Sequence, residues 1–212
     1  MANTSRQSVM GPRLPALSRA EGEGDADRCP TPALHEAQLT SALVYHGDFL
    51  KVQRDIVRLP DGKTTAREYI RHPGAVVILP LFEDGSVLLE RQFRYPLNQV
   101  FIEFPAGKID PDETPLDCAK RELQEETGYT ATDWQFLCTI HNAIAYSDEH
   151  LDIFLARGLT AGASRLDDGE FLETFSAPLA DVLAWVGEGK VTDVKTIIGV
   201  FWLEKILRGD WR

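Results

Sequence analysis

The sequence predicts an α/β (α+β) fold in which helices cover both sides of a mixed β-sheet, with a small antiparallel β-subdomain ahead of it. Short β-like stretches separated by turn signals occupy residues 42–104, and a strongly amphipathic helical pattern covers residues 114–127. Two further helical patterns end the chain. Because strands and helices alternate irregularly, a helix–sheet–helix sandwich is favoured over a doubly wound parallel sheet.

Size and charge limit the kind of protein this can be. A chain of 212 residues with 43% apolar residues can bury one sizeable core, and two full independent domains are not expected. The net charge of −11 and the pI near 4.9 argue against nucleic acid or an anionic membrane as partners, because both would be repelled over most of the surface. The expected partner is therefore a small molecule.

The cysteines and the apolar runs predict a cytoplasmic protein with reduced thiols. Cys29, Cys118 and Cys138 are widely spaced and odd in number, so neither a disulfide framework nor a zinc site is predicted. The longest apolar run, residues 75–82, is interrupted by Pro80 and is too short to span a bilayer. The first twenty residues lack the apolar segment of a signal peptide.

Composition divides the chain into three parts. Residues 1–38 mix Ser, Arg, Gly, Pro and acidic residues without periodicity, so they are expected to form a disordered leader. Residues 39–72 are assigned to a small N-terminal β-subdomain, with strands at Leu43–Tyr45 and Phe49–Val57 bounded by turn-forming residues. Residues 73–212 form the main domain in this division.

The main domain opens with two apolar stretches, Gly74–Phe82 and Ser86–Phe93, on either side of the turn signal Glu83-Asp84-Gly85. This pattern predicts a β-hairpin. Further along the chain, residues 101–104, 134–140 and 151–155 are strand-like, and residues 179–186 and 191–207 have helical spacing on either side of two glycines.

The helical pattern at residues 114–127 is the clearest in the chain. Leu116, Ala119 and Leu123 recur at i, i+3 and i+7 and form one apolar stripe, and Gly128 is expected to end the helix. The same helix carries a second, acidic face.

Glu122, Glu125 and Glu126 all project from that face. Like charges at this spacing repel one another, and Arg121 can neutralise only part of the group. Carboxylate oxygens gathered without thiolate or imidazole partners suit Mg²⁺ or Mn²⁺. The alternative is an acidic helix face that is merely solvated.

The spacing of the whole segment favours the metal site. Residues 107–129, GKIDPDETPLDCAKRELQEETGY, satisfy the pattern G-x5-E-x7-R-E-U-x-E-E-x-G-U at every fixed position, where U is a bulky apolar or aromatic residue. In this the chain resembles the Nudix hydrolase family. The resemblance implies a Nudix fold and a loop–helix–loop in which Glu122 and Glu126 bind metal and Glu125 binds it directly or through water. It also implies that Arg121 and Glu113 orient these carboxylates, with Mg²⁺ as cofactor and Mn²⁺ as a substitute.

Outside this motif the chain resembles the ADP-ribose pyrophosphatase branch of that family. The matching segments are Arg67–Tyr69, His72–Ala75, Glu90–Arg94 and Phe101–Lys108. The resemblance implies that Arg94 contacts the diphosphate, that Glu103 lies in the substrate pocket, and that Ala106 offers its carbonyl oxygen to a metal. The guanidinium fork of Arg94 matches phosphate oxygens, although a solvated residue at a strand end is the alternative.

A loop after the motif supplies the candidate general base. Ser147-Asp148-Glu149 fits the branch's Ser-(Asp/Asn)-Glu loop, whose Glu acts as the base or positions the attacking water. Without the resemblance, Glu149 would be interpreted as an ordinary polar loop residue. Ile144-Ala145 stands where ADP-ribose-specific members usually carry Pro-Gly, a departure that concerns the substrate and leaves the reaction class unchanged.

The resemblance further implies that the N-terminal sheet swaps over a partner subunit and helps to hold the nucleobase. It therefore predicts a homodimer, with Tyr45, Phe49, Arg67 and Tyr69 as candidate pocket residues. Aromatic residues at alternating strand positions are more often part of a core. The histidines at positions 46, 72, 141 and 150 show no metal-ligand spacing and are interpreted as structural or surface residues.

Three functional hypotheses follow. The first is Mg²⁺-dependent hydrolysis of ADP-ribose to AMP and ribose 5-phosphate. The second is cleavage of another nucleotide sugar or a dinucleotide, such as GDP-mannose, which Ile144-Ala145 favours. The third is a non-catalytic domain that senses a nucleotide; loss of metal carboxylates would be expected there, and each motif carboxylate is present.

Overall fold

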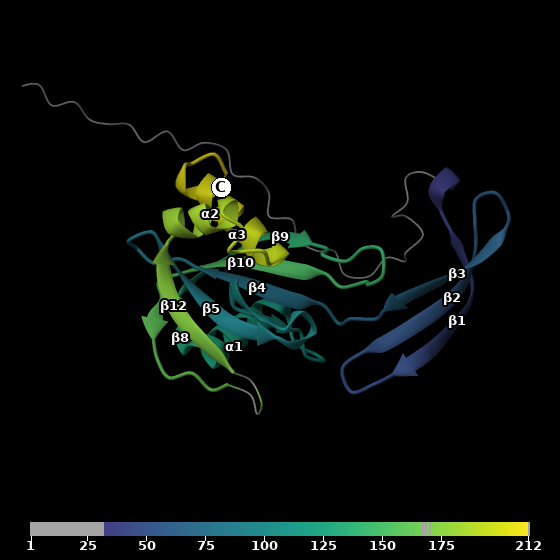
Figure 1. Cartoon of the computed structure of the whole chain (residues 1–212), viewed down its shortest axis with the longest axis horizontal. Coiled ribbons are helices and arrows are strands. Elements are labelled where there is room, and N and C mark those ends of the chain that lie inside the picture. Colours follow the sequence, from purple (N-terminus) through teal and green to yellow (C-terminus); the bar gives the residue numbers. More distant parts are fainter. Residues whose placement is uncertain (1–31, 167–168, 170, 212) are drawn as a thin grey trace, which may run out of the picture.

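A computed structural model describes residues 32–166, 169 and 171–211, and Figure 1 shows a body of sheets and helices with a three-stranded sheet set to one side. The side sheet contains β1 (Ala37–His46), β2 (Lys51–Arg58) and β3 (Thr64–Ile70), preceded by the short turn η2 (Pro32–Leu34). The strands of the body are β4 (Ala75–Pro80), β5 (Ser86–Arg94), β6 (Gln99–Glu103), β7 (Ala106–Lys108), β8 (Tyr129–Thr130), β9 (Asp133–Ile140), β10 (Leu151–Arg157), β11 (Thr160–Ala161) and β12 (Leu172–Pro178). Its helices are α1 (Pro115–Thr127), α2 (Leu179–Gly187) and α3 (Val194–Leu207), with the turn η3 (Tyr95–Leu97) after β5.

A mixed sheet in the order β7-β4-β10-β9 forms the centre of the body. β4 and β10 are parallel, and the other two pairs are antiparallel. All six residues of β4 are buried because both faces of the sheet are covered. Val76 and Ile78 pack in the core under α1, whereas Val77 and Leu79 pack in the core under α2 and α3. The predicted sandwich of helices around a mixed sheet is confirmed.

The segment Gly74–Phe93 is not the hairpin that its sequence predicts. The turn itself forms, with the Phe82 N–H donating to the Ser86 carbonyl at 2.9 Å and one antiparallel bridge between Leu81 and Val87. Beyond that bridge the strands separate: β4 pairs with β10 and β7, and β5 joins a second sheet in the order β12-β5-β6. Turn residues determine only the local reversal, whereas the partners of β4 come from segments about 30 and 75 residues away in the chain. The strands β7, β8, β11 and β12 were not predicted at all.

Helix α1 begins and ends where the sequence indicates. The Thr114 hydroxyl accepts a hydrogen bond from the Asp117 N–H, Pro115 occupies the first helical position, and Gly128 ends the helix in the left-handed region with φ of 76°. Cys118, Ala119 and Leu123 are fully buried against the sheet. Burial of Leu123 alone contributes about 2 kcal/mol.

Helix α3 starts later than its apolar pattern predicts. The expected helix begins at residue 191, but Val191 is buried in the core before the helix starts. The helix begins at Val194 because the Asp193 carboxylate caps it, accepting the Thr196 N–H at 2.9 Å. The two-glycine break after α2 is present as predicted, with Gly189 in the left-handed region at φ of 72°.

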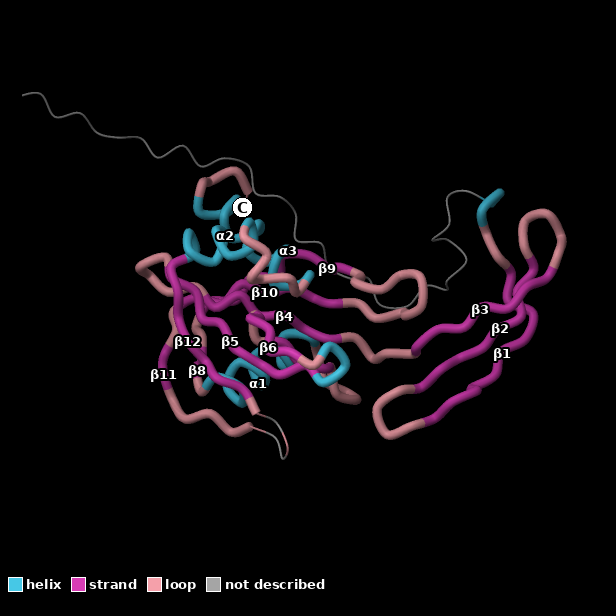
Figure 2. The backbone as a smooth tube through the Cα atoms, viewed as in Figure 1, coloured by secondary structure: helices cyan, strands magenta, loops and turns pink. Residues whose placement is uncertain are grey.

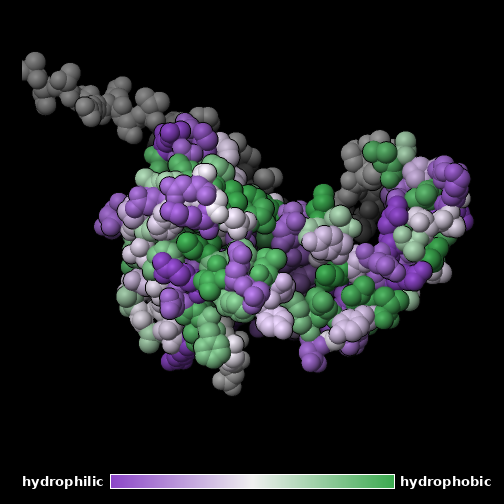
Figure 3. All heavy atoms as spheres, viewed as in Figure 1, coloured by the Kyte–Doolittle hydropathy of each residue, from purple (hydrophilic) through white to green (hydrophobic). Residues whose placement is uncertain are grey.

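The side sheet exposes much of its apolar surface. All ten residues of β1 are exposed, including Leu43, Val44 and Tyr45, and Figure 3 shows hydrophobic side chains on this lobe. Figure 2 shows that the sheet continues into the body through the segment after β3. β1 starts at Ala37, two residues before the expected subdomain boundary. Residues 32–36 of the expected leader are described and include η2, and residues 1–31 lie outside the described residues.

Two further findings concern the cysteine thiols and the length and apolarity of the helices. Cys118 and Cys138 are free thiols, and burial raises the pKa of both; Cys29 lies outside the described residues. Of the helices that the structure describes, none combines the length and apolarity needed to cross a membrane.

Candidate active site

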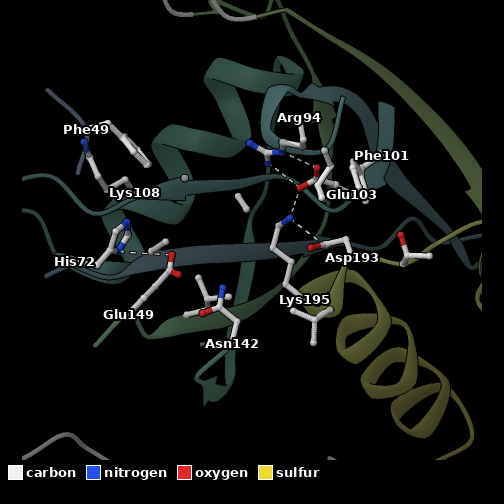
Figure 4. Close-up of a pocket in the computed structure, with 17 residues that line it drawn as sticks. Phe49, His72, Arg94, Phe101, Glu103, Lys108, Asn142, Glu149, Asp193 and Lys195 are labelled. Atoms are coloured by element: carbon white, nitrogen blue, oxygen red, sulfur yellow. Dashed lines mark hydrogen bonds and ion pairs between the residues drawn. The ribbon is translucent and has the colours of Figure 1, made fainter. Parts of the chain in front are cut away.

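A cavity of about 530 Å³ lies between the start of the motif segment (residues 107–129), the end of β6, the start of α3 and the loop before β10 (Figure 4). Its lining includes five of the residues predicted from sequence: Phe49, Arg94, Glu103, Ala106 and Glu149. Residues that the sequence did not single out also line it, among them Phe101, Asn142, Asp193 and Lys195. Such a volume is within the usual range of small-molecule sites.

Two cations share one buried carboxylate on one side of this cavity, formed by Arg94, Glu103 and Lys195 and here called the far wall. Arg94 donates from Nε and a terminal nitrogen to the two oxygens of Glu103, both at 2.7 Å, and the Lys195 ammonium contacts the same carboxylate. The Glu103 side chain is only 2% exposed. Burial alone would raise the pKa of Glu103, but the hydrogen bonds from Arg94 and the charge of Lys195 outweigh it and lower the pKa. This wall therefore keeps Glu103 ionised and pairs its two cations with two carboxylates, Glu103 and Asp193.

The first turn of α3 holds this cluster in place. Asp193 accepts from Lys195 at 3.0 Å while it caps the helix. The next residue, Thr196, is fully buried, and its hydroxyl accepts the Phe104 N–H at 2.9 Å. Helix α3 thus fixes both the lysine and the strand end from which Glu103 projects.

Helix α1, here called the carboxylate helix because it carries Glu122, Glu125 and Glu126, has Arg121 at the centre of its acidic group. Its guanidinium binds Glu113 through two hydrogen bonds of 2.9 Å and also donates to Glu122 at 2.7 Å and to Glu125 at 2.9 Å. The hydrogen bonds from Arg121 lower the pKa of Glu113 to about 2. The predicted pairing of Arg121 with Glu113 is present, and the same arginine also contacts two of the three helix carboxylates.

Glu122 and Glu126 lie against the backbone of Ala106 and Gly107. The Ala106 N–H donates to Glu126 Oε2 at 3.1 Å, and Glu126 is only 4% exposed. A Cβ on Gly107 would lie 1.8 Å from Glu122 Cδ, so any larger residue there would displace this carboxylate from its present position. Two carboxylates beside a backbone carbonyl are an all-oxygen donor set that suits a hard divalent cation.

Across residues 32–166, 169 and 171–211, however, no three carboxylate, imidazole or thiolate groups already converge as a metal-ligating cluster. One reason is that Arg121 already holds Glu122 and Glu125 by hydrogen bonds. The residues fit a cation that would compete with Arg121 for these oxygens.

Glu149 faces the cavity from the opposite side, beside His72. Glu149 Oε1 approaches His72 Nδ1 to 3.7 Å, and His72 Nδ1 accepts the Gly74 N–H at 3.1 Å. Because that nitrogen already accepts a hydrogen bond, the approach to Glu149 is a contact rather than a second hydrogen bond. His72, interpreted from sequence as a structural or surface residue, lines the cavity with a side chain that is 16% exposed.

The other N-terminal candidates lie away from this cavity. Arg67 pairs with Glu36 at 2.6 Å, and the Tyr69 hydroxyl donates to Asp55 at 3.1 Å. Tyr45 is 56% exposed and packs beside Gly47. Of the four side-sheet candidates, only Phe49 lines the cavity, so any role of the other three in substrate binding would depend on a second subunit.

Lys195 is the most informative residue that sequence reasoning missed. The signal available was Asp193-x-Lys195-Thr196 at a helix start, where an N-cap acid precedes a lysine that the helix turns inward. Nothing local distinguishes this lysine from a solvated one. Its burial and its contact with Glu103, 92 residues earlier, arise only when α3 packs against β6.

Comparison with known proteins identifies the family of the chain. The family model of the NUDIX domain matches residues 71–194, more than half of the chain. The chain belongs to the Nudix family. A second model, the nucleoside diphosphate sugar hydrolase N-terminal domain, matches residues 36–70, which form the side sheet of this Nudix protein.

Individual Nudix relatives align over most of the chain. The ADP-ribose pyrophosphatase of Bacillus subtilis is 34% identical over 174 residues, covering 81% of this chain and 94% of that protein. The methanol dehydrogenase activator of Bacillus methanolicus is also 34% identical, over 171 residues that cover 80% and 92% of the two chains. A solved structure of an ADP compounds hydrolase superposes with a TM-score of 0.76 at 25% identity, covering 84% of this chain and 98% of that one.

Proposed function

We propose that this Nudix protein hydrolyses the diphosphate bond of a nucleoside diphosphate sugar with Mg²⁺, and that ADP-ribose, cleaved to AMP and ribose 5-phosphate, is its substrate. The observation that carries the proposal is a cavity lined by an arginine fork, a buried lysine and the backbone of Ala106 and Gly107, against which the motif carboxylates Glu122 and Glu126 pack. The names of the relatives, ADP-ribose pyrophosphatase and ADP compounds hydrolase, support the substrate class.

Glu122, Glu126 and the Ala106 carbonyl would hold the cation, and Glu125 would assist directly or through water. When bound, Mg²⁺ would neutralise diphosphate charge and acidify a water molecule. Arg121 and Glu113 would keep the carboxylates oriented. Mn²⁺ would serve as a substitute because it accepts the same oxygen donors.

Arg94 would bind the diphosphate through its outer edge. Its side chain is 43% exposed although one edge is held by Glu103, so donors remain for a phosphate oxygen. Holding the guanidinium in place before substrate arrives reduces the entropy lost on binding. Lys195 would add positive charge on the side of Glu103 that faces α3 and would keep Glu103 ionised.

Glu149 would accept a proton from the attacking water. Its side chain is 23% exposed and lines the cavity, which gives it access to both solvent and substrate. A carboxylate in that position can act as a general base when it lies within hydrogen-bond reach of the water. Glu149→Gln removes this basicity with little change in size and should lower kcat much more than KM.

We further propose that the protein is a cytoplasmic homodimer that assembles through the side sheet. The exposed apolar residues of β1 support this, because contiguous exposed apolar patches larger than a few hundred Å² usually mark an interface. A second subunit would also bring Tyr45, Arg67 and Tyr69 towards a pocket. Sedimentation equilibrium should give twice the chain mass, and Leu43→Lys with Val44→Lys should give the monomer.

A substrate panel tests the reaction. Purified protein with Mg²⁺ is given ADP-ribose, GDP-mannose, other nucleotide sugars and a dinucleotide, and kcat/KM is compared. We expect ADP-ribose to be cleaved fastest, with AMP as one product. Faster cleavage of GDP-mannose would replace ADP-ribose by the alternative that Ile144-Ala145 favours.

A regulatory role is the second candidate, because a relative of equal identity is named methanol dehydrogenase activator. In that case the domain would bind a nucleotide and act on a partner enzyme. Binding of ADP-ribose without release of AMP, at saturating Mg²⁺, would support this role over hydrolysis.

A further inference from the structure

The segment Ile70–Ala75, here called the linker, joins β3 to β4 and contacts three separate parts of the protein. The Arg71 N–H donates to the Lys51 carbonyl of β2 at 2.9 Å, and the Ile109 N–H of the motif segment donates to the Gly74 carbonyl at 3.1 Å. The Ala75 N–H donates to the His150 carbonyl at 2.9 Å. The linker is therefore a fixed point between the side sheet, the metal motif and the start of β10.

The loop that carries Glu149 lies directly on this linker. The Ile70 N–H donates to the Tyr146 carbonyl at 2.8 Å, the Asp148 N–H donates to the Ile70 carbonyl at 3.2 Å, and Ile70 and Ser147 form a parallel bridge. Within the loop, the Ser147 hydroxyl accepts the Glu149 N–H at 3.1 Å. The loop thus lies beside the last residue of β3 and pairs with it.

The Asp148 carboxylate uses both of its oxygens on the linker. Oδ1 accepts the His72 N–H at 2.7 Å, and Oδ2 forms an ion pair with Arg71 at 3.0 Å. Glu149, the next residue, points instead into the cavity beside His72 (Figure 4). Asp148 faces the linker while Glu149 faces the cavity, so fixing Asp148 on the linker fixes the backbone from which Glu149 projects.

Gly74 provides an independent sign that this contact is tight. It has φ of 96°, and a Cβ placed on it would lie 2.4 Å from Cε1 of His150, the residue after Glu149. The linker and the loop therefore approach each other from both sides of Glu149. Such contacts hold a side chain more narrowly than an exposed loop would.

We propose that Asp148 is a positioning residue, which holds the Glu149 carboxylate at the attacking water by fastening its loop to the linker. This inference rests on the proposed role of Glu149 as the base, and it assigns to Asp148 a contribution that acts only through Glu149. Misplacing a reacting group by about 1 Å costs on the order of 100-fold in rate.

Three variants separate the two contacts of Asp148. Asp148→Ala removes both, and kcat should fall by about 30- to 100-fold while KM changes less than about threefold. Asp148→Asn keeps an oxygen for the His72 N–H and should recover most of that loss, to within about threefold of wild type. Arg71→Gln removes only the ion pair, whose side chains are 58% and 34% exposed, and should also cost no more than about threefold. Arg208→Gln, which breaks an ion pair with Glu204 of similar exposure on α3, is the matched control and should leave kcat unchanged.

Combination with Glu149→Gln gives the decisive measurement. If Asp148 acts through Glu149, adding Asp148→Ala to Glu149→Gln causes no further loss of kcat. Losses that multiply would overturn the proposal, as would Asp148→Ala retaining wild-type kcat while Glu149→Gln is impaired. If Glu149→Gln itself keeps wild-type kcat, the assignment of the base fails instead. Should Asp148→Ala unfold, Asp148→Ser, whose shorter hydroxyl cannot make both linker contacts, is combined with Glu149→Gln in the same way, with the same expected absence of further loss.

Discussion

The carboxylate helix and the far wall of the cavity are assembled in opposite ways. Glu113, Arg121, Glu122 and Glu126 come from one stretch of fourteen residues whose spacing follows the turns of a single helix. Arg94, Glu103 and Lys195 come from three segments and meet because β5 pairs with β6 and α3 packs against β6. The first arrangement is therefore visible in the sequence, and the second is visible only in part.

The difference also appears in how each region handles charge. On α1 one arginine serves three carboxylates, which leaves an excess of negative charge for a cation. On the far wall two cations are paired with two carboxylates, Glu103 and Asp193, and the exposed edge of the Arg94 guanidinium keeps N–H donors for phosphate oxygens. A metal-bound diphosphate would need both kinds of surface at once.

The largest effect is expected on the helix. Glu126→Gln should lower kcat/KM by about 10³-fold, because the amide is a poor ligand for Mg²⁺ yet can still accept the Ala106 N–H. The thermal midpoint should stay close to wild type, since the shape of this buried side chain is kept. Steady-state kinetics and circular dichroism melting check both parts. An unfolded variant would mean that the carboxylate serves packing rather than metal binding.

Gly107→Ala should act on the same side of the cavity with a smaller effect. The new methyl group would occupy the space of the Glu122 carboxylate, so Mn²⁺ affinity should fall by about 10- to 100-fold. Titration of Mn²⁺ followed by electron paramagnetic resonance measures this. Gly187→Ala, where a methyl group meets no atom within 4 Å, is the control and should bind Mn²⁺ like wild type.

Lys195→Met tests the far wall. Removing its charge should raise KM for the nucleotide sugar by about 10-fold and leave Mn²⁺ affinity unchanged, because Glu103 keeps its fork with Arg94. Lys205→Met, on the same helix but in an exposed pair with Asp210, should leave KM unchanged. Equal changes in Mn²⁺ affinity and KM would mean that the two walls do not act separately.

The smallest effect concerns stability in acid. The pKa of Glu113 is lowered from 4.5 to about 2 by Arg121, so its contribution to stability is present above pH 4.5 and is lost as the pH falls towards 2. In metal-free protein, Arg121→Gln should therefore lose less of its thermal midpoint than wild type between pH 5 and pH 2. Arg208→Gln should follow the wild-type slope. Identical slopes for Arg121→Gln and wild type would remove Glu113 from the acid transition.

Long-range pairing explains where prediction of the fold succeeded and failed. The bounds of α1 were predicted to within a residue because Thr114, Pro115 and Gly128 act within a few residues of the helix ends. The start of α3 was missed by three residues because the burial of Val191 outweighed its helical spacing. The hairpin predicted at Gly74–Phe93 was wrong because its turn signal contains no information about β10, the strand with which β4 pairs.

By itself the sequence determined the family, the carboxylate motif at residues 107–129 and the presence of one sandwiched core, since each depends on spacing within a short segment or on the overall apolar pattern. Tertiary structure alone decided that Lys195 joins Arg94 on Glu103, that His72 lines the cavity, and that Asp148 fastens the Glu149 loop to the linker. These contacts join residues 76 to 92 positions apart. Their cause is the packing of separate elements against the central sheet, which no local pattern records.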